Sequence, residues 1–155
     1  MILTRVENGH SFLQKLKLGA IAVQVGERAP DVARVLLYRP ELFGKPVNKY
    51  FQRLLRGASE WTVGERELIA AYVSHANECR FCFSSHRAVA ARALGQEVVE
   101  AVFAEIATAP ITPQLRATLA FVQKLAQHPT AVEKSDADAV RAAGVSNAAL
   151  ENAVH

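Results

Sequence analysis

Helix start and stop signals recur along the chain and constrain its fold more than any other feature. Thr62 and Glu65 form a T-x-x-E capping box, in which the hydroxyl and the carboxylate each accept a hydrogen bond from a backbone amide that the helix leaves unpaired. Thr112 directly precedes a proline, a second start signal, and Gly95 and Gly144 lie where predicted helices end. No run of β-branched residues alternates with polar ones for more than a few positions. The sequence therefore predicts an all-α fold.

The spacing of apolar residues between these signals predicts a series of helices. Their expected ranges are 8–25 with an interruption at Gly19, 32–39, 41–56 with a split near Gly44, 63–77, 80–94, 96–106, 113–127, a helix that starts with a capping box of Ser135 and Asp138, and a last one that starts at Ser146. Half of the 155 residues are apolar, enough to bury about 70% of the unfolded chain's surface around one core. We therefore expect residues 1–155 to form a single domain.

Charge and hydropathy narrow the class of protein. The net charge of +3 comes from lysines and arginines that are scattered along the chain. Because a phosphate backbone is bound by clustered positive charge, we expect no nucleic-acid partner. No window reaches about 18 consecutive apolar residues, so we expect no membrane span, and the first residues lack the pattern of an export signal. These features predict a cytoplasmic protein, where reducing thiol pools disfavour a structural disulfide.

The two cysteines of the chain, Cys79 and Cys82, form a C-x-x-C pair at the predicted start of the helix over 80–94. His86 follows Cys82 by four residues, a spacing that brings the imidazole one helical turn from the thiol on the same face. Glu67 lies twelve residues before Cys79, in the preceding predicted helix. A carboxylate, a histidine and two close thiols indicate a redox or metal site.

The electrostatic surroundings of the two thiols differ. A thiol at a helix start lies at the positive end of the helix dipole, which lowers its pKa. His86 adds a base beside Cys82, whereas Glu78 places a negative charge beside Cys79. We therefore expect Cys82 to be the nucleophile and Cys79 the resolving thiol, with a reversible disulfide between them. We expect Glu67 to orient His86 across the two helices or to pass protons to it through a water.

Other interpretations of these residues stay open. Cys79, Cys82 and His86 supply three zinc ligands, and His75, four residues before Cys79, supplies a fourth in a structural or sensing centre. The disulfide state of the pair could instead switch contacts with another protein, and cysteines also occur as small buried apolar residues without chemistry. His75 is more readily explained as an auxiliary polar group at the edge of the site.

The order of these residues also resembles a known family. Glu67, eleven residues, Cys79-x-x-Cys82, three residues and His86 are similar to the motif of the alkyl hydroperoxidase D (AhpD) and carboxymuconolactone decarboxylase superfamily, on its peroxidase-related side. Residues 113–154 resemble that family's following segment, a proline-started helix and two shorter helices. The resemblance extends from about residue 40 to the end of the chain.

The resemblance implies an AhpD-like helical bundle with the C-x-x-C pair at the start of a central helix, assembled as a homo-oligomer, commonly a trimer or hexamer. It implies a thiol-dependent peroxidase that reduces organic hydroperoxides or hydrogen peroxide, with an external dithiol as reductant and without a cofactor or metal. Cys82 then matches the peroxidatic thiol and Cys79 its resolving partner. His86 matches the base, and Glu67 matches the carboxylate of the proton relay.

Two features depart from the family pattern. Glu78 stands directly before the first cysteine, where the family often has a small residue. The family also usually continues into a longer C-terminal helix, so we expect part of that helix to be absent here. The decarboxylase branch generally lacks the cysteine pair, and lactone decarboxylation is therefore disfavoured.

Overall fold

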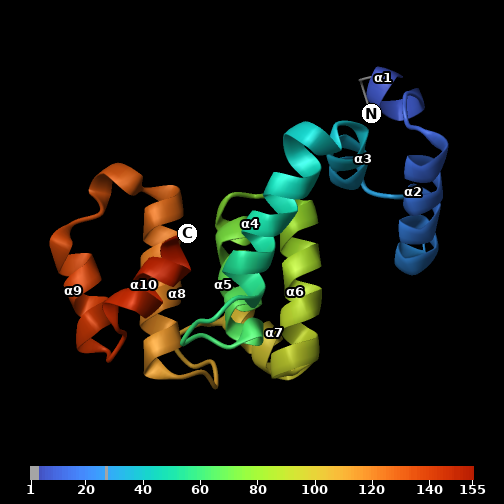
Figure 1. The fold of residues 1–155 in the computed structure, drawn as a ribbon. Helices are drawn as coiled ribbons and strands as arrows, with labels where there is room; N and C mark the ends of the chain where they lie inside the picture. The colour runs from blue at the N-terminus through green and yellow to red at the C-terminus, as the bar shows by residue number, and fades with distance from the viewer. Residues whose placement is uncertain (1–3, 27) are drawn as a thin grey trace. The chain divides into compact units, whose positions relative to one another are not determined.

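The computed structural model describes residues 4–26 and 28–155 (Figure 1). Within these residues the chain forms helices joined by short loops and contains no strand, so the all-α prediction is confirmed. No helix in these ranges combines the length and apolar character that crossing a membrane requires. Backbone contacts divide the chain into two compact units, with the boundary between Arg53 and Leu54. That the whole chain forms one domain stays a prediction.

The first unit runs through α1 (Thr4–Asn8), α2 (Phe12–Val25), α3 (Asp31–Tyr38), the π-helical turn Pro40–Gly44 and most of α4 (Lys45–Arg56). Ser11 and Gln14 form a capping box at the start of α2, and Gly26 ends this helix. The interruption predicted at Gly19 is wrong, because a single glycine costs a helix interior only about 1 kcal/mol and α2 continues through it. The split predicted near Gly44 is confirmed.

The second unit consists of α5 (Val63–Ala76), α6 (Arg80–Leu94), α7 (Gln96–Ala104), α8 (Pro113–Gln127), the 3-10 turn Pro129–Ala131, α9 (Lys134–Ala142) and α10 (Asn147–Val154). In Figure 1 the two green helices α5 and α6 lie side by side, and α8 packs against α5, α9 and α10. The core among these helices includes the fully buried side chains of Leu68, Val99 and Leu119. The predicted bounds of α5 to α8 agree with the structure to within two residues.

Most of the predicted helix ends are confirmed. The hydroxyl oxygens of Thr62, Thr112 and Ser146 each accept a hydrogen bond from the amide three residues further on, at 3.2, 3.2 and 3.0 Å. Gly95 and Gly144 follow the ends of their helices with φ of 97° and 92°. These bonds join residues close in sequence, which is why the sequence predicts them.

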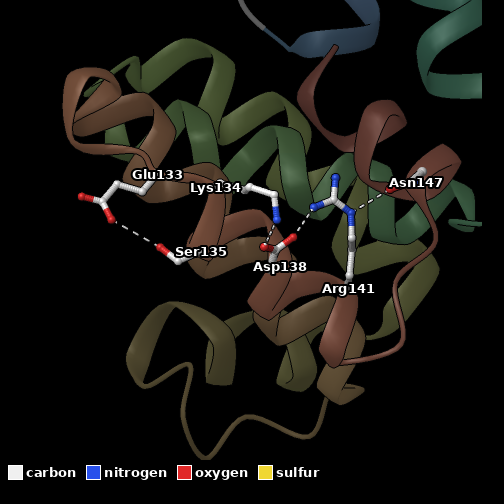
Figure 2. A network of polar contacts seen from close by, with 6 residues as sticks. All are labelled: Glu133, Lys134, Ser135, Asp138, Arg141 and Asn147. Atoms are coloured by element: carbon white, nitrogen blue, oxygen red, sulfur yellow. Dashed lines mark hydrogen bonds and ion pairs between the residues drawn. The ribbon is translucent and has the colours of Figure 1, made fainter.

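The start of α9 differs from the prediction by two residues. Glu133 is the N-cap, and its amide donates to Oδ2 of Asp136 at 2.7 Å. The hydroxyl of Ser135 reaches only the Glu133 carboxylate, at 3.4 Å (Figure 2). The carboxylate of Asp138 instead accepts hydrogen bonds from Lys134 at 2.6 Å and from Arg141 at 2.9 Å. Figure 2 shows both contacts. Asp138 is therefore a surface ion-pair residue within the helix and not part of its cap.

A buried arginine fixes the segment between α4 and α5. Arg66, in the first turn of α5, is buried, and its Nη1 donates to the carbonyl oxygens of Leu54 at 2.8 Å and Gly57 at 2.9 Å. These bonds tie the end of α4 to the start of α5. They also hold the backbone on both sides of Arg56, which belongs to the site described below.

Gly64 lets α5 and α6 pack closely. A Cβ atom at this position would lie 2.8 Å from Cγ of Leu94 and 2.9 Å from Cβ of Ala93, both on α6. An ordinary contact between carbon atoms is about 3.5–4.0 Å, so a side chain here would push the two helices apart. At Gly19 in α2, by contrast, no heavy atom lies within 4 Å of the position that a Cβ would take.

We expect Gly64→Ala to lower the free energy of unfolding by about 1–3 kcal/mol, because the added methyl group overpacks the contact between α5 and α6. The matched control is Gly19→Ala, which should raise the free energy of unfolding by about 0.4–1 kcal/mol because alanine restricts the unfolded chain and meets no neighbour. Urea denaturation measures both. An unchanged unfolding midpoint in Gly64→Ala would contradict the close approach.

Candidate active site

The turn between α5 and α6 positions the first thiol. Glu78 has a φ of 56°, a left-handed conformation in which glycine is usual. The amide of Glu78 donates to the carbonyl of His75 at 3.0 Å, and the amide of Cys79 donates to the carbonyl of Ser74 at 2.9 Å, the pattern of a Schellman motif. A side chain at the left-handed position costs about 1–2 kcal/mol. The turn sets Cys79 at the N-cap of α6.

Cys79 caps α6 and Cys82 lies in its first turn, and both are free, partly buried thiols. The hydrogen bond from the Cys82 thiol lowers the pKa of Cys79. The backbone amides of Cys82 and Phe81 point towards the Cys79 sulfur and also lower its pKa. The sulfur does not form a capping hydrogen bond with α6. The same thiol–thiol hydrogen bond, together with burial, raises the pKa of Cys82. The ionisation of each thiol therefore depends on the other, and the first proton lost belongs to the pair.

The sequence predicted Cys82 as the nucleophile, because His86 is a base beside it and Glu78 places a negative charge beside Cys79. Glu78 is exposed, so water screens its charge from Cys79. The order of ionisation does not decide which sulfur attacks a substrate, and the roles assigned to the two cysteines stay predictions.

A buried carboxylate lies at the centre of the site. Glu67 in α5 is 2% exposed. Its Oε2 lies 2.6 Å from Nδ1 of His86 in α6, and its Oε1 lies 2.5 Å from Nη2 of Arg56 at the end of α4. Burial acts to raise the pKa of the Glu67 carboxyl, but the hydrogen bonds and charges of His86 and Arg56 outweigh it and hold that pKa below its ordinary value. Glu67 is therefore ionised at neutral pH.

The ionised carboxylate fixes the tautomer of His86. An ionised carboxylate only accepts hydrogen bonds, so Nδ1 of His86 is the donor and carries a proton. The lone pair of the neutral imidazole then lies on Nε2, the nitrogen with which a histidine in this tautomer acts as a base. The structure thus contains the contact between Glu67 and His86 that the sequence predicted.

Sequence reasoning missed Arg56, which it counted among the scattered surface cations. One signal pointed to a cation: Glu67 lies in an apolar helical stretch, and an unpaired buried charge is costly. The sequence does not identify which arginine supplies it, because Arg56 lies eleven residues upstream on another helix.

His75 lies in an aromatic cluster. Its ring centroid is 5.1 Å from that of Phe83 and 5.6 Å from that of Phe103. Across residues 4–26 and 28–155, no group of three or more His, Cys, Asp or Glu side chains is arranged to hold a metal ion. The described geometry therefore gives the zinc interpretation no ligand set.

Comparison with known proteins identifies the family. Residues 41–124, more than half of the chain, match the family model of the carboxymuconolactone decarboxylase family, and the chain belongs to this family. The matched segment contains Glu67, the cysteine pair and His86. No curated protein matches the sequence.

Two solved structures share the fold of the chain. An uncharacterized peroxidase-related protein from Silicibacter sp. TM1040 is 22% identical with a TM-score of 0.75, and the match covers 93% of this chain and 76% of that one. The second, described as an alkylhydroperoxidase AhpD core, is an uncharacterized peroxidase-related protein from Ralstonia eutropha JMP134. It is 24% identical with a TM-score of 0.73, over 94% of this chain and 76% of that one. The predicted AhpD-like helical fold is thereby confirmed.

We expect Glu67→Gln to lower the free energy of unfolding at neutral pH by about 1.5–3 kcal/mol, because it weakens hydrogen bonds to a charged group. The pKa of Glu67 is lowered in the folded state, so its contribution is complete above its ordinary value of about 4.3 and is lost as the pH falls through the folded value. The stability difference between wild type and variant should therefore shrink as the pH falls below about 4.3 in urea denaturation. A difference that stays constant would contradict a stabilised anion at Glu67.

Proposed function

We propose that this protein is a thiol-dependent peroxidase of the alkyl hydroperoxide reductase type, which cycles through a Cys79–Cys82 disulfide and acts as an antioxidant. The observation that carries the proposal is the arrangement on α5 and α6. Two free thiols lie at the start of α6, His86 follows Cys82 one turn later, and the buried Glu67 fixes the tautomer of His86. The family match and the peroxidase-related structural neighbours support this class of reaction.

In the first step Cys82 attacks the peroxide. Nε2 of His86 takes the proton of the Cys82 thiol, and the sulfur attacks one oxygen of the hydroperoxide. The oxygen–oxygen bond breaks, a sulfenic acid forms on Cys82, and His86 returns the proton to the departing alkoxide, which leaves as an alcohol. Glu67 stabilises the imidazolium between the two proton transfers.

In the second step Cys79 resolves the sulfenic acid. The Cys79 thiol loses its proton, and its sulfur attacks the sulfur of Cys82 while hydroxide leaves and takes up that proton to give water. The net reaction converts two thiols and one hydroperoxide into a disulfide, an alcohol and water, or two waters when the substrate is hydrogen peroxide. An external dithiol then returns two electrons and two protons by thiol–disulfide exchange.

We assign the active form to a homo-oligomer, a trimer or hexamer, in the cytoplasm. Support for assembly comes from α2, which exposes large apolar side chains, including Phe12 at 81% and Val23 at 85%. Large exposed apolar patches mark interaction sites, and a second subunit would cover this one. Light scattering on the reduced protein should give the mass of a trimer or hexamer, and a monomer would contradict the assignment.

The peroxidase proposal is tested on reduced, metal-free protein treated with one equivalent of tert-butyl hydroperoxide. Wild type should lose both thiols and decrease in mass by about 2 Da, as expected for a disulfide. Cys79→Ser should retain a sulfenic acid on Cys82, which dimedone traps. His86→Gln should slow peroxide consumption by about 100-fold or more, because the base is lost.

The controls separate the roles of the two sulfurs. Ser84→Ala removes an exposed hydroxyl from the same helix and should react like wild type. If Cys82→Ser forms a sulfenic acid on Cys79 and Cys79→Ser does not react, then Cys79 is the attacking thiol and Cys82 the resolving one. Unchanged thiols in treated wild type would remove the proposal altogether.

A further inference from the structure

Arg56 is the second partner of the Glu67 carboxylate. Its Nη2 lies 2.5 Å from Oε1, on the oxygen that His86 does not use. The carboxylate is 2% exposed, whereas the side chains of Arg56 and His86 are 39% and 25% exposed. The anion therefore lies inside the protein, with a guanidinium on one side and an imidazole on the other.

The summed charge of Arg56, Glu67 and His86 determines how readily Glu67 and His86 bind a further proton. With Arg56 present, an ionised Glu67 and a neutral His86 sum to zero, and a proton added to His86 makes the group cationic. Without Arg56, the same two groups would carry a buried negative charge, and one more proton would neutralise it. Because Glu67 and His86 share a hydrogen bond, that proton belongs to the pair, whichever residue holds it.

We propose that Arg56 is a positioning residue that neutralises Glu67 from the side opposite His86 and so keeps the imidazole unprotonated and able to act as a base at neutral pH. The inference rests on the function proposed above, because that function gives His86 the role of base. Arg56 acts through Glu67 and is not itself a catalytic residue.

The local backbone holds Arg56 at this position. Its Nη1 donates to the carbonyl of Leu55 at 2.9 Å. The buried Arg66 binds the carbonyl oxygens of Leu54 and Gly57, which lie on either side of Arg56 in the chain. The end of α4 is therefore fixed to α5, and the guanidinium reaches the carboxylate from an anchored segment.

Within the described residues, the charged groups around Glu67 come from α4, α5 and α6. Arg56 belongs to the end of α4, Arg66 to α5 itself, and His86 to α6. Arg66 interacts with both Arg56 and Glu67 through its charge but directs its Nη1 to backbone carbonyls. α8, which also packs against α5, contributes no charge to the lowered pKa of Glu67. Arg56 is thus the cation that hydrogen-bonds the carboxylate.

The test compares wild type with Arg56→Met and Arg56→Lys, all reduced and metal-free. The NMR signals of the His86 ring, assigned by their loss in His86→Gln, are followed against pH. In Arg56→Met the pH at which these signals change should rise by about one unit or more, because an opposite charge beside the carboxylate is lost. Arg56→Lys, which keeps the charge, should stay close to wild type. The rising limb of the pH profile of peroxide consumption should move in the same direction.

Arg87→Met is the matched control. Arg87 is 37% exposed, close to the exposure of Arg56, but pairs with Glu100 on α7, so its loss should leave the His86 titration unchanged. Arg56→Gln repeats the test if Arg56→Met is unfolded by circular dichroism. If the pH at which the His86 signals change stays the same or falls in Arg56→Met and Arg56→Gln, the inference is overturned. Because the NMR readout needs no turnover, wild type that titrates as expected but consumes no peroxide would instead remove the proposed function.

Discussion

The carboxylate of Glu67 lies almost entirely out of water, and the site depends on keeping it charged there. An unpaired buried carboxylate costs several kcal/mol, so both of its oxygens need partners. His86 and Arg56 supply them from two different helices, α6 and α4. The segment that Arg66 holds in place and the close contact at Gly64 allow these helices to meet around one side chain.

The thiol pair depends on a second local constraint, the left-handed turn at Glu78. The turn lets α6 begin directly after Cys79, so this sulfur lies at the positive end of the helix. The two thiols lie close enough that the ionisation of one affects the other. In the reaction proposed above, one of these sulfurs attacks the peroxide and the other resolves the sulfenic acid.

Local signals predicted the helices well where one cap was available and less well where several competed. Thr62, Thr112 and Ser146 cap their helices as expected, because each cap bonds an amide three residues away. Before α9 the run from Glu133 to Asp138 offers several residues able to cap, and the pairing of Asp136 with Lys124 of α8 accompanies the earlier start. That pairing joins two helices and leaves no pattern in the local sequence.

The sequence by itself determined the all-α class, the cysteine pair at a helix start and the placement of His86 one turn after Cys82, because each follows from spacing within one helix. Only the tertiary structure decided that Arg56 pairs with the buried carboxylate of Glu67. The physical reason is the range of the interactions. Caps and helical faces are set by neighbours in the chain, whereas the partner of a buried charge is set by how separate elements pack.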